Sequence, residues 1–222
     1  MSLLKGFAAR LPDRWQVELK RYHFRKQIRK GTFVSSEPEF EILQDFIVPG
    51  DWVVDIGANV GYYTKRLSEL VGPQGRVIAF EPVPETFSLL AANVQLFAHP
   101  NVTLVNAAVS DRLDLVGMSM PKMPSGLANF YQAHISPVED SPFSVLTLSL
   151  DSLCVSQRIA LIKIDAEGHE PLVLSGMMEL IKRHRPVLVV ETFSDEVIES
   201  LAALDYRWEK HKKSANIVFQ PN

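Results

Sequence analysis

A glycine-rich turn directly after a short buried strand is the feature that most constrains the fold of this chain. Residues 52–56 are apolar except for Asp55, and they run straight into Gly57-Ala58-Asn59-Val60-Gly61. Glycine permits backbone conformations that other residues avoid, and the helix after such a turn presents free N–H groups at its start. A strand, a glycine turn and a helix in this order predict a βαβ unit with a ligand site at the turn.

The same alternation of short apolar runs and helical segments continues along the chain. Strands that alternate with helices of about ten to fifteen residues are typical of a parallel sheet covered on both faces. We therefore predict a doubly wound α/β domain with a mainly parallel, seven-stranded sheet. The expected strands are 52–56, 76–80, 102–105, 159–164, 186–190, 206–210 and 217–220, with the last two antiparallel, and the expected helices are 62–70, 87–94, 169–183 and 195–204.

The beginning of the chain departs from this alternation. Residues 1–48 are predicted to form a helical N-terminal extension, ahead of a domain over residues 49–222. A helix is expected to begin at Asp13, because apolar residues recur after it at helical spacing. They form two stripes: Trp15, Leu19 and Tyr22 on one, and Val17, Phe24 and Ile28 on the other.

A second departure lies within the domain. Residues 111–150 hold four prolines and three methionines, and they show no convincing helical pattern. A long apolar insertion near the carboxyl edge of a sheet is often a lid or a wall of the substrate site. An extra hairpin that covers the core is an equally good interpretation of residues 111–150.

Composition and charge narrow the function. The chain has 222 residues, 46% hydrophobic and 22% charged, and a single cysteine, Cys154, which is expected in the core. These values are ordinary for a globular protein and exclude a disulfide scaffold. Residues 1–30 carry a net charge of +7, whereas the rest carries −10. The basic helix is expected to dock on the acidic body, because Trp15 and Leu19 need burial; RNA or an anionic membrane surface are the alternative partners.

The longest uncharged run does not indicate a membrane span. Residues 86–110 lack formal charge, but Pro100-Asn101 divides them into a helix and a strand. The N-terminus has no signal-peptide pattern. We therefore expect a cytoplasmic protein.

Acidic and amide residues at the ends of the next two strands suggest the ligand. Glu81-Pro82 follows the second strand, where a carboxylate can accept hydrogen bonds from both ribose hydroxyls. Asn106-Ala107 follows the third strand, at the expected adenine edge. Asn59 and Tyr62 replace the second and third glycines of the dinucleotide pattern, which weakens the case for a pyrophosphate. S-adenosylmethionine, a nucleoside with an ammonium group and a carboxylate but no phosphate, suits the site better.

Several of these segments resemble the FkbM-type methyltransferases, over about residues 49–193. The resemblance implies a Rossmann-like class I fold and S-adenosylmethionine as cofactor. It also implies methyl transfer to hydroxyl groups of sugars or macrolide natural products. The segments are Asp55 to Thr64, Phe80-Glu81-Pro82, residues 106–111, Leu150-Asp151-Ser152-Leu153, residues 163–170 and Arg185-Pro186 with Glu191.

The resemblance also assigns residues to the cofactor. It places Asp55, Gly57, Ala58, Asn59 and Gly61 around the methionine moiety. It places Glu81 and Pro82 at the ribose and Asn106 and Ala107 near the base. Residues 163–170 would face the site of methyl transfer.

A hydroxyl acceptor must lose its proton, so the site needs a base. Asp165 is the first candidate, although it could instead hold the ammonium group of the cofactor; His169 and Glu191 are the others. Lys163 either orients these groups or forms a structural ion pair. Glu167 and Glu170 also suit a helix N-terminus as caps. The spacing matches no metal motif, so no metal is expected.

The sequence thus predicts an S-adenosylmethionine-dependent methyltransferase that acts on a hydroxyl of a saccharide or secondary metabolite. Two alternatives stay open: an RNA methyltransferase that uses the basic helix, and a nucleoside-binding protein without catalysis.

Overall fold

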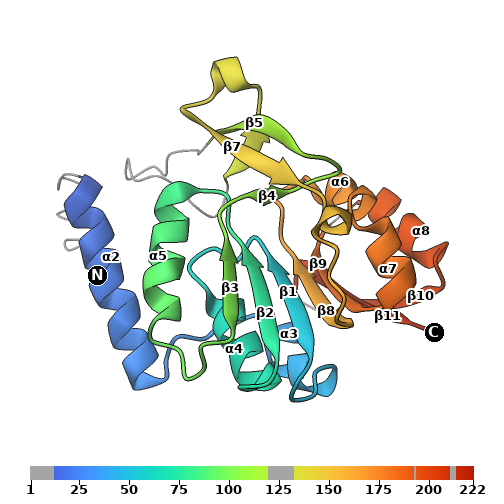
Figure 1. Cartoon of the computed structure of the whole chain (residues 1–222), viewed down its shortest axis with the longest axis horizontal. Coiled ribbons are helices and arrows are strands. Elements are labelled where there is room, and N and C mark those ends of the chain that lie inside the picture. Colours follow the sequence, from blue (N-terminus) through green and yellow to red (C-terminus); the bar gives the residue numbers. More distant parts are fainter. Residues whose placement is uncertain (1–12, 120–132, 193, 211–213) are drawn as a thin grey trace.

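A seven-stranded sheet forms the centre of the computed structural model, which describes residues 13–119, 133–192, 194–210 and 214–222. The strand order is β10-β11-β9-β8-β1-β2-β3 (Figure 1). The strands from β9 to β3 are parallel, whereas β11 is antiparallel to both of its neighbours, so the sheet is mixed. The strands are β1 (Trp52–Ile56), β2 (Arg76–Phe80), β3 (Val102–Val105), β8 (Ile159–Ile164), β9 (Val187–Glu191), β10 (Tyr206–Lys210) and β11 (Asn216–Pro221).

Helices cover both faces of this sheet because successive side chains of a strand point to opposite faces. Val53 of β1 and Val77 of β2 face α3 (Glu39–Ile42) and α4 (Tyr62–Val71), and α5 (Pro84–Val94) packs on Ala79 of the same face. Val54 and Ile56 face the opposite way, into the larger core. That core also holds residues of α6 (Glu170–Ser175), α7 (Met178–His184) and α8 (Asp195–Ala202).

The helix expected over residues 169–183 is divided into α6 and α7. The division falls at Gly176, where a Cβ atom would lie 1.9 Å from the carbonyl oxygen of Ser110. This contact brings the segment around Ser110 against the junction between the two helices. Two other sequence predictions need correction here: α5 begins at Pro84 rather than at residue 87, and Cys154 is exposed rather than buried.

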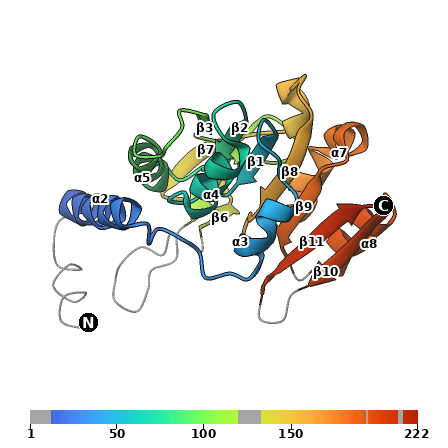
Figure 2. The ribbon, with the colours of Figure 1, turned by 90° about the horizontal axis from the view of Figure 1, so that it is seen from below.

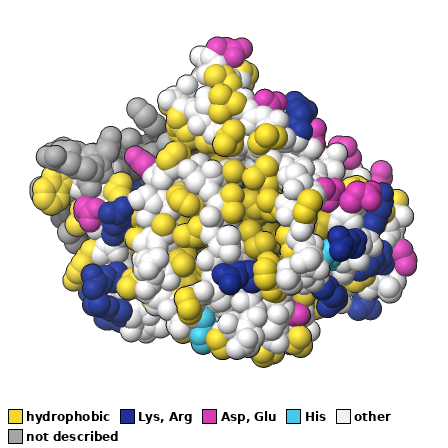
Figure 3. All heavy atoms as spheres, viewed as in Figure 1, with side chains coloured by type: hydrophobic (Ala, Val, Ile, Leu, Met, Phe, Trp, Pro, Cys, Tyr) yellow, Lys and Arg dark blue, Asp and Glu magenta, His cyan; other side chains and the backbone are white. Residues whose placement is uncertain are grey.

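The N-terminal helix α2 (Asp13–Lys30) lies beside α5, as Figures 1 and 2 both show. Phe24 is buried in the contact and packs with Phe33 and Leu89. The stripe of Trp15, Leu19 and Tyr22 stays exposed, so the expectation that it is the buried stripe was wrong. Basic side chains gather on the flank where α2 lies (Figure 3).

The described part of the insertion, together with residues 108–109, forms a second sheet, here called the small sheet, with the order β4-β7-β5-β6. It lies at the carboxyl ends of the central strands (Figure 1). Its inner face packs Met118 and Val145 against Val83. Residues 120–132, which include part of the predicted insertion, lie outside the described residues. The strands are β4 (Ala108–Val109), β5 (Asp114–Ser119), β6 (His134–Ser136) and β7 (Phe143–Leu148).

The uncharged run of residues 86–110 is divided into a helix and a strand, as predicted. Within the described ranges, no helix combines the length and the apolar character needed to cross a membrane.

Candidate active site

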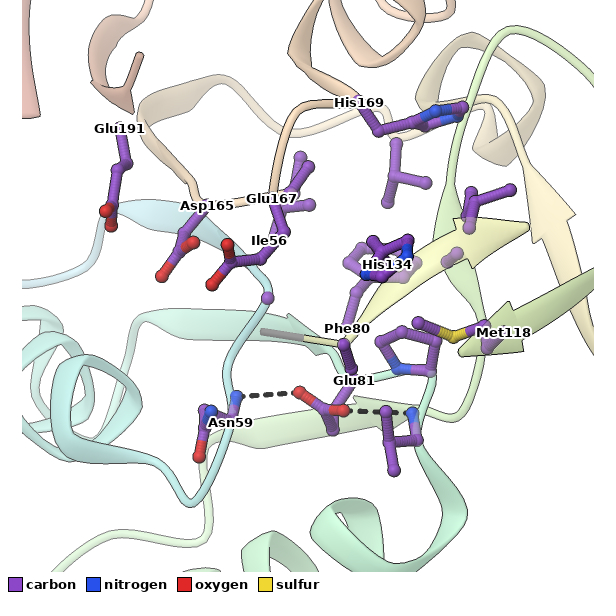
Figure 4. Close-up of a pocket in the computed structure, with 18 of the residues that line it drawn as sticks. Ile56, Asn59, Phe80, Glu81, Met118, His134, Asp165, Glu167, His169 and Glu191 are labelled. Atoms are coloured by element: carbon purple, nitrogen blue, oxygen red, sulfur yellow. Dashed lines mark hydrogen bonds between the residues drawn. The ribbon is translucent and has the colours of Figure 1, made fainter. Parts of the chain in front are cut away.

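A cavity of about 400 Å³ lies between the carboxyl ends of the central strands and the small sheet (Figure 4). Two groups of residues line it. The β2 wall consists of Gly57 and Asn59 after β1, with Glu81, Pro82, Val83 and Ala107 after β2 and β3. The β8 wall consists of Asp165, Ala166, Glu167 and His169 after β8, with Glu191 at the end of β9. Met118 and His134 reach the cavity from the small sheet.

The glycine turn brings two strand ends into direct contact. Gly57 has a φ of +74°, and a Cβ atom on it would lie 1.9 Å from the carbonyl oxygen of Asp165. The Gly57 and Ala58 N–H groups both donate to the carbonyl oxygen of Phe80, at 3.0 and 2.9 Å. Gly61 begins α4 with a φ of +100°. The turn therefore packs on β8 as closely as backbone allows, which only a glycine at position 57 permits.

Glu81 is fixed by the backbone that surrounds it. Its two carboxylate oxygens accept hydrogen bonds from the N–H groups of Asn59 and Val83, both at 2.9 Å. Burial raises the pKa of Glu81 to about 7, with Asp165 and Asp55 adding to the shift. Each oxygen keeps a second lone pair, so the carboxylate can still accept two hydroxyl groups.

The polar end of β3 supports Glu81 rather than facing the cavity. The side-chain amide of Asn106 donates to the carbonyl oxygens of Glu81 and Pro82, at 2.8 and 3.0 Å. Pro82, Val83, Ala107 and Met118 leave an apolar surface beside Glu81. A carboxylate with two free lone pairs next to an apolar surface suits a nucleoside.

Lys163 and two carboxylates form a buried ionic group beneath the cavity. The ammonium of Lys163, 4% exposed, donates to Asp165 at 2.9 Å. Burial alone would lower the pKa of Lys163, but Asp165 and Asp55 outweigh burial and raise that pKa. Asp55 is fully buried and accepts the Thr64 hydroxyl at 2.6 Å. Burial raises the pKa of Asp55.

The β8 wall carries the titratable groups that point into the cavity. Burial and the neighbouring Asp165 raise the pKa of Glu191 to about 7. The pKa of Glu167, at a backbone φ of +49°, is also raised, first by burial. Burial lowers the pKa of His169, whose Nε2 lies 2.9 Å from the Ser110 hydroxyl. Figure 4 shows Glu191, Asp165 and Glu167 near one another and His169 on the far side.

Glu170 has a structural role. It is 4% exposed, and its Oε1 accepts the N–H groups of Ala166 and Gly168, both at 3.1 Å. These bonds hold the turn that carries Glu167, ahead of α6, and α6 itself has no side-chain cap hydrogen bond. Within the described residues, no group of three or more His, Cys, Asp or Glu is arranged to hold a metal ion.

Most of the residues predicted from sequence meet at this cavity. Gly57, Asn59, Glu81, Pro82, Ala107, Asp165, His169 and Glu191 line it, and Ala58 and Lys163 line an adjoining hollow. Asp55, Gly61 and Asn106 stand behind these walls and line neither. The sequence did not single out Glu37, Val83, Met118 or His134 as site residues. Met118 and His134 belong to the insertion of residues 111–150, for which a wall of the substrate site was one of the two predictions, whereas the sequence around Glu37 carries no signal of a site.

A doubly wound α/β fold with a fixed carboxylate at the end of β2 is the arrangement of enzymes that bind a nucleoside-containing cofactor at the carboxyl ends of their strands. The family model described as "Methyltransferase FkbM domain" matches residues 55–208, more than half of the chain. The chain belongs to this family of methyltransferases, and S-adenosylmethionine is its cofactor.

The similarity to individual curated proteins covers smaller parts of the chain than the family model does. The chain is 36% identical over 55 residues to a protein-L-isoaspartate O-methyltransferase of Triticum aestivum, which covers 25% of this chain and 24% of that protein. It is 29% identical over 142 residues to the hexuronic acid methyltransferase AglP of Haloferax volcanii, over 63% of this chain and 55% of AglP. The chain thus spans about a quarter and about half of these two relatives.

A solved structure shares the fold. The crystal structure of an FkbM methyltransferase from Methylobacillus flagellatus KT superposes with a TM-score of 0.54 at 17% identity. The superposition covers 77% of this chain and 43% of that chain.

Proposed function

We propose that the chain transfers the methyl group of S-adenosylmethionine to a hydroxyl group of a saccharide or secondary metabolite. The observation that carries the proposal is Glu191, a half-buried carboxylate in the cavity with a pKa raised to about 7. A hydroxyl group must lose its proton as its oxygen bonds to the methyl carbon. A carboxylate with a pKa near neutrality is suited to accept that proton.

The cofactor supplies an activated methyl group, and the residues of the chain position the reactants. Glu81 holds the ribose, which fixes the direction of the rest of the cofactor. Alignment of this kind accounts for much of the rate in a transfer between two bound reactants, about 7–11 kcal/mol in favourable cases. Glu191 accepts the proton of the acceptor hydroxyl, and the C–O bond forms as the bond between sulfur and methyl breaks.

The other two candidate bases are less suited. One carboxylate oxygen of Asp165 already accepts a hydrogen bond from the buried ammonium of Lys163, at 2.9 Å. His169 is tied to Ser110, on the opposite side of the cavity from Glu191 (Figure 4). Asp165 and Lys163 act instead as a fixed pair that shapes the floor of the site.

The charge of the cavity favours a neutral acceptor. Glu81, Asp165, Glu167 and Glu191 all line it, and the ammonium of Lys163 is paired below. Such a surface repels a carboxylate or a phosphate. The acceptor is therefore a neutral saccharide or polyol rather than a uronic acid, an isoaspartyl peptide or RNA. The similarity to AglP, named for a sugar acid, supports the saccharide but not the acid.

Transfer of labelled methyl groups from S-adenosylmethionine tests this proposal. The acceptors are neutral glycosides, their uronic acid counterparts, an isoaspartyl peptide and total RNA, each at matched concentration. We expect label in a neutral glycoside and little in its uronic acid. Label in RNA or in the peptide would overturn the proposal, and so would label in the uronic acid at an equal or higher rate.

A further inference from the structure

A segment upstream of the family domain forms one wall of the cofactor site. Residues 34–37, which follow α2, line a hollow of about 330 Å³ beside the main cavity. Across the hollow lie Gly57, Asn59 and Asp165, which also line the main cavity. Glu37 lines both spaces. The hollow is therefore an extension of the cofactor site past the glycine turn.

The orientation of the nucleoside determines what enters this hollow. Glu81 marks the position of the ribose, and the apolar surface of Pro82, Val83 and Met118 lies on one side of it. The base would lie on that surface. The amino-acid arm of the cofactor would then leave the ribose in the other direction, past Asn59 toward Asp165, which lie on the other side of Glu81 in Figure 4. This arm ends in an ammonium group and a carboxylate.

Two carboxylates line the hollow, and only one of them is paired. Asp165 accepts a hydrogen bond from Lys163 at 2.9 Å. Glu37 accepts the Ser35 hydroxyl at 3.0 Å, and among the described residues no lysine, arginine or histidine nitrogen lies within 4.0 Å of its carboxylate. Lys163 is near enough to Glu37 for the two charges to interact, but it forms its ion pair with Asp165, so the Glu37 carboxylate can still pair with an incoming ammonium group.

We propose that Glu37 binds the α-ammonium group of S-adenosylmethionine. The cofactor site would then extend beyond residues 55–208, the part that the family model matches. The inference rests on the cofactor and does not depend on the acceptor proposed above.

Glu37 is held in place from both sides. Upstream, Phe33 is 1% exposed and stacks on the ring of Tyr62 with 4.1 Å between ring centroids. Downstream, Glu39 is buried and accepts a hydrogen bond from the side-chain amide of Asn216 in β11. The N–H of Glu37 donates to the Ser35 hydroxyl at 3.2 Å. The carboxylate is thus positioned before the cofactor binds, which limits the entropy lost on binding.

Two ligands distinguish binding of the ammonium group by Glu37 from a purely structural role of Glu37. S-adenosylhomocysteine has the ammonium group, whereas 5′-methylthioadenosine has the same nucleoside and sulfur without the amino-acid arm. Calorimetry measures the affinity of both ligands for the wild-type chain, for Glu37→Gln and for Glu41→Gln. Glu41 is an exposed carboxylate of α3 that lines neither space, so its replacement is a matched control.

We expect Glu37→Gln to weaken S-adenosylhomocysteine binding about tenfold or more, since it removes a charge-assisted hydrogen bond. The affinity for 5′-methylthioadenosine should be unchanged, and Glu41→Gln should match the wild type for both ligands. Equal weakening of both ligands by Glu37→Gln would overturn the inference, and so would no change in either. If the wild-type chain bound neither ligand, the cofactor site itself would be wrong.

Discussion

The β2 wall of the cavity is built mainly from backbone, whereas the β8 wall is built mainly from titratable side chains. On the β2 wall, Glu81 is bound by two N–H groups and the Gly57 turn packs against a carbonyl oxygen. On the β8 wall, Asp165, Glu167 and Glu191 point into the cavity, and the pKa of Glu191 is raised to about 7. A cofactor that is the same throughout an enzyme family is best bound by backbone groups in a fixed geometry. An acceptor that differs between enzymes is best bound by side chains, because substitutions can change them.

Replacement of the proposed base should have the largest effect and should leave the β2 wall intact. We expect Glu191→Gln to lower kcat by about 10²- to 10⁴-fold, the usual contribution of a general base. The affinity for S-adenosylhomocysteine should not change, because the Gln side chain has the same shape and lies on the other wall. Single-turnover methyl transfer and calorimetry measure the two quantities.

Asp165→Asn gives the contrast for this experiment. It leaves Lys163 without its ion-pair partner. We therefore expect it to weaken cofactor binding as well as turnover. If Glu191→Gln retained the wild-type kcat, the assignment of proton transfer to the β8 wall and of cofactor binding to the β2 wall would be wrong.

The glycine turn gives the next largest effect, on stability. Gly57→Ala places a methyl group 1.9 Å from the Asp165 carbonyl at a positive φ, so β1 and β8 must separate. We expect a loss of about 3 kcal/mol or more in the free energy of unfolding, and loss of S-adenosylhomocysteine binding. Gly168→Ala on the β8 wall has a similar φ of +91° but meets nothing within 4 Å.

Gly168→Ala is therefore the matched control and should lose only about 1 kcal/mol. Urea denaturation measures both variants. Equal losses would mean that the close approach of Gly57 to β8 contributes nothing to stability.

Glu81 makes the β2 wall sensitive to pH. Its pKa in the empty site is about 7, and hydroxyl groups that donate to the carboxylate favour the ionised form. As the pH falls below 7 the carboxylate takes up a proton, which the ligand must displace. The affinity for S-adenosylhomocysteine should therefore fall by up to about tenfold per pH unit between pH 7 and pH 6, and level off above pH 8.

Two variants assign this dependence to one wall. Glu81→Gln should bind weakly at every pH, and Glu191→Gln should keep the wild-type dependence although the pKa of Glu191 is also about 7. The reverse pattern would place the titrating group on the β8 wall.

The sequence predicted the buried part of this molecule better than its half-exposed part. The runs at 52–56, 76–80 and 159–164 coincide with β1, β2 and β8, because strands buried on both faces leave a continuous apolar signal. The run at 102–105 coincides with β3, an edge strand that is only partly buried. The small sheet is covered on one face only, and the sequence indicated it only as an extra hairpin within residues 111–150. The exposed stripe of α2 was misassigned because two apolar stripes compete and only tertiary packing chooses between them.

A site residue could be predicted where it directly follows an apolar strand. Glu81 and Asp165 each follow an apolar strand directly, so their position along the chain reveals their role. Glu37 follows no apolar strand, and His134 lies in β6, a short strand of the small sheet, so contacts distant in sequence bring both residues to the cavity. The chain's local pattern identifies residues that a strand delivers, and it gives no sign of those delivered by packing.

Replacement of Glu170 is expected to have the smallest effect, and it compares two buried carboxylates, one on each wall. Like Glu81, Glu170 is a buried carboxylate that accepts two backbone N–H groups, but both bonds end on the same oxygen, Oε1. A glutamine has one such oxygen, so Glu170→Gln can keep both bonds and loses only the help of the charge, about 1 kcal/mol of stability. In Glu81 the two hydrogen bonds use different oxygens, and a glutamine side chain can accept only one of them.

Thermal denaturation should therefore find Glu170→Gln slightly less stable than the wild type. Calorimetry should find that its affinity for S-adenosylhomocysteine is unchanged, whereas Glu81→Gln should bind this ligand more weakly. If Glu170→Gln lost cofactor affinity, the turn that carries Glu167 would belong to the cofactor site.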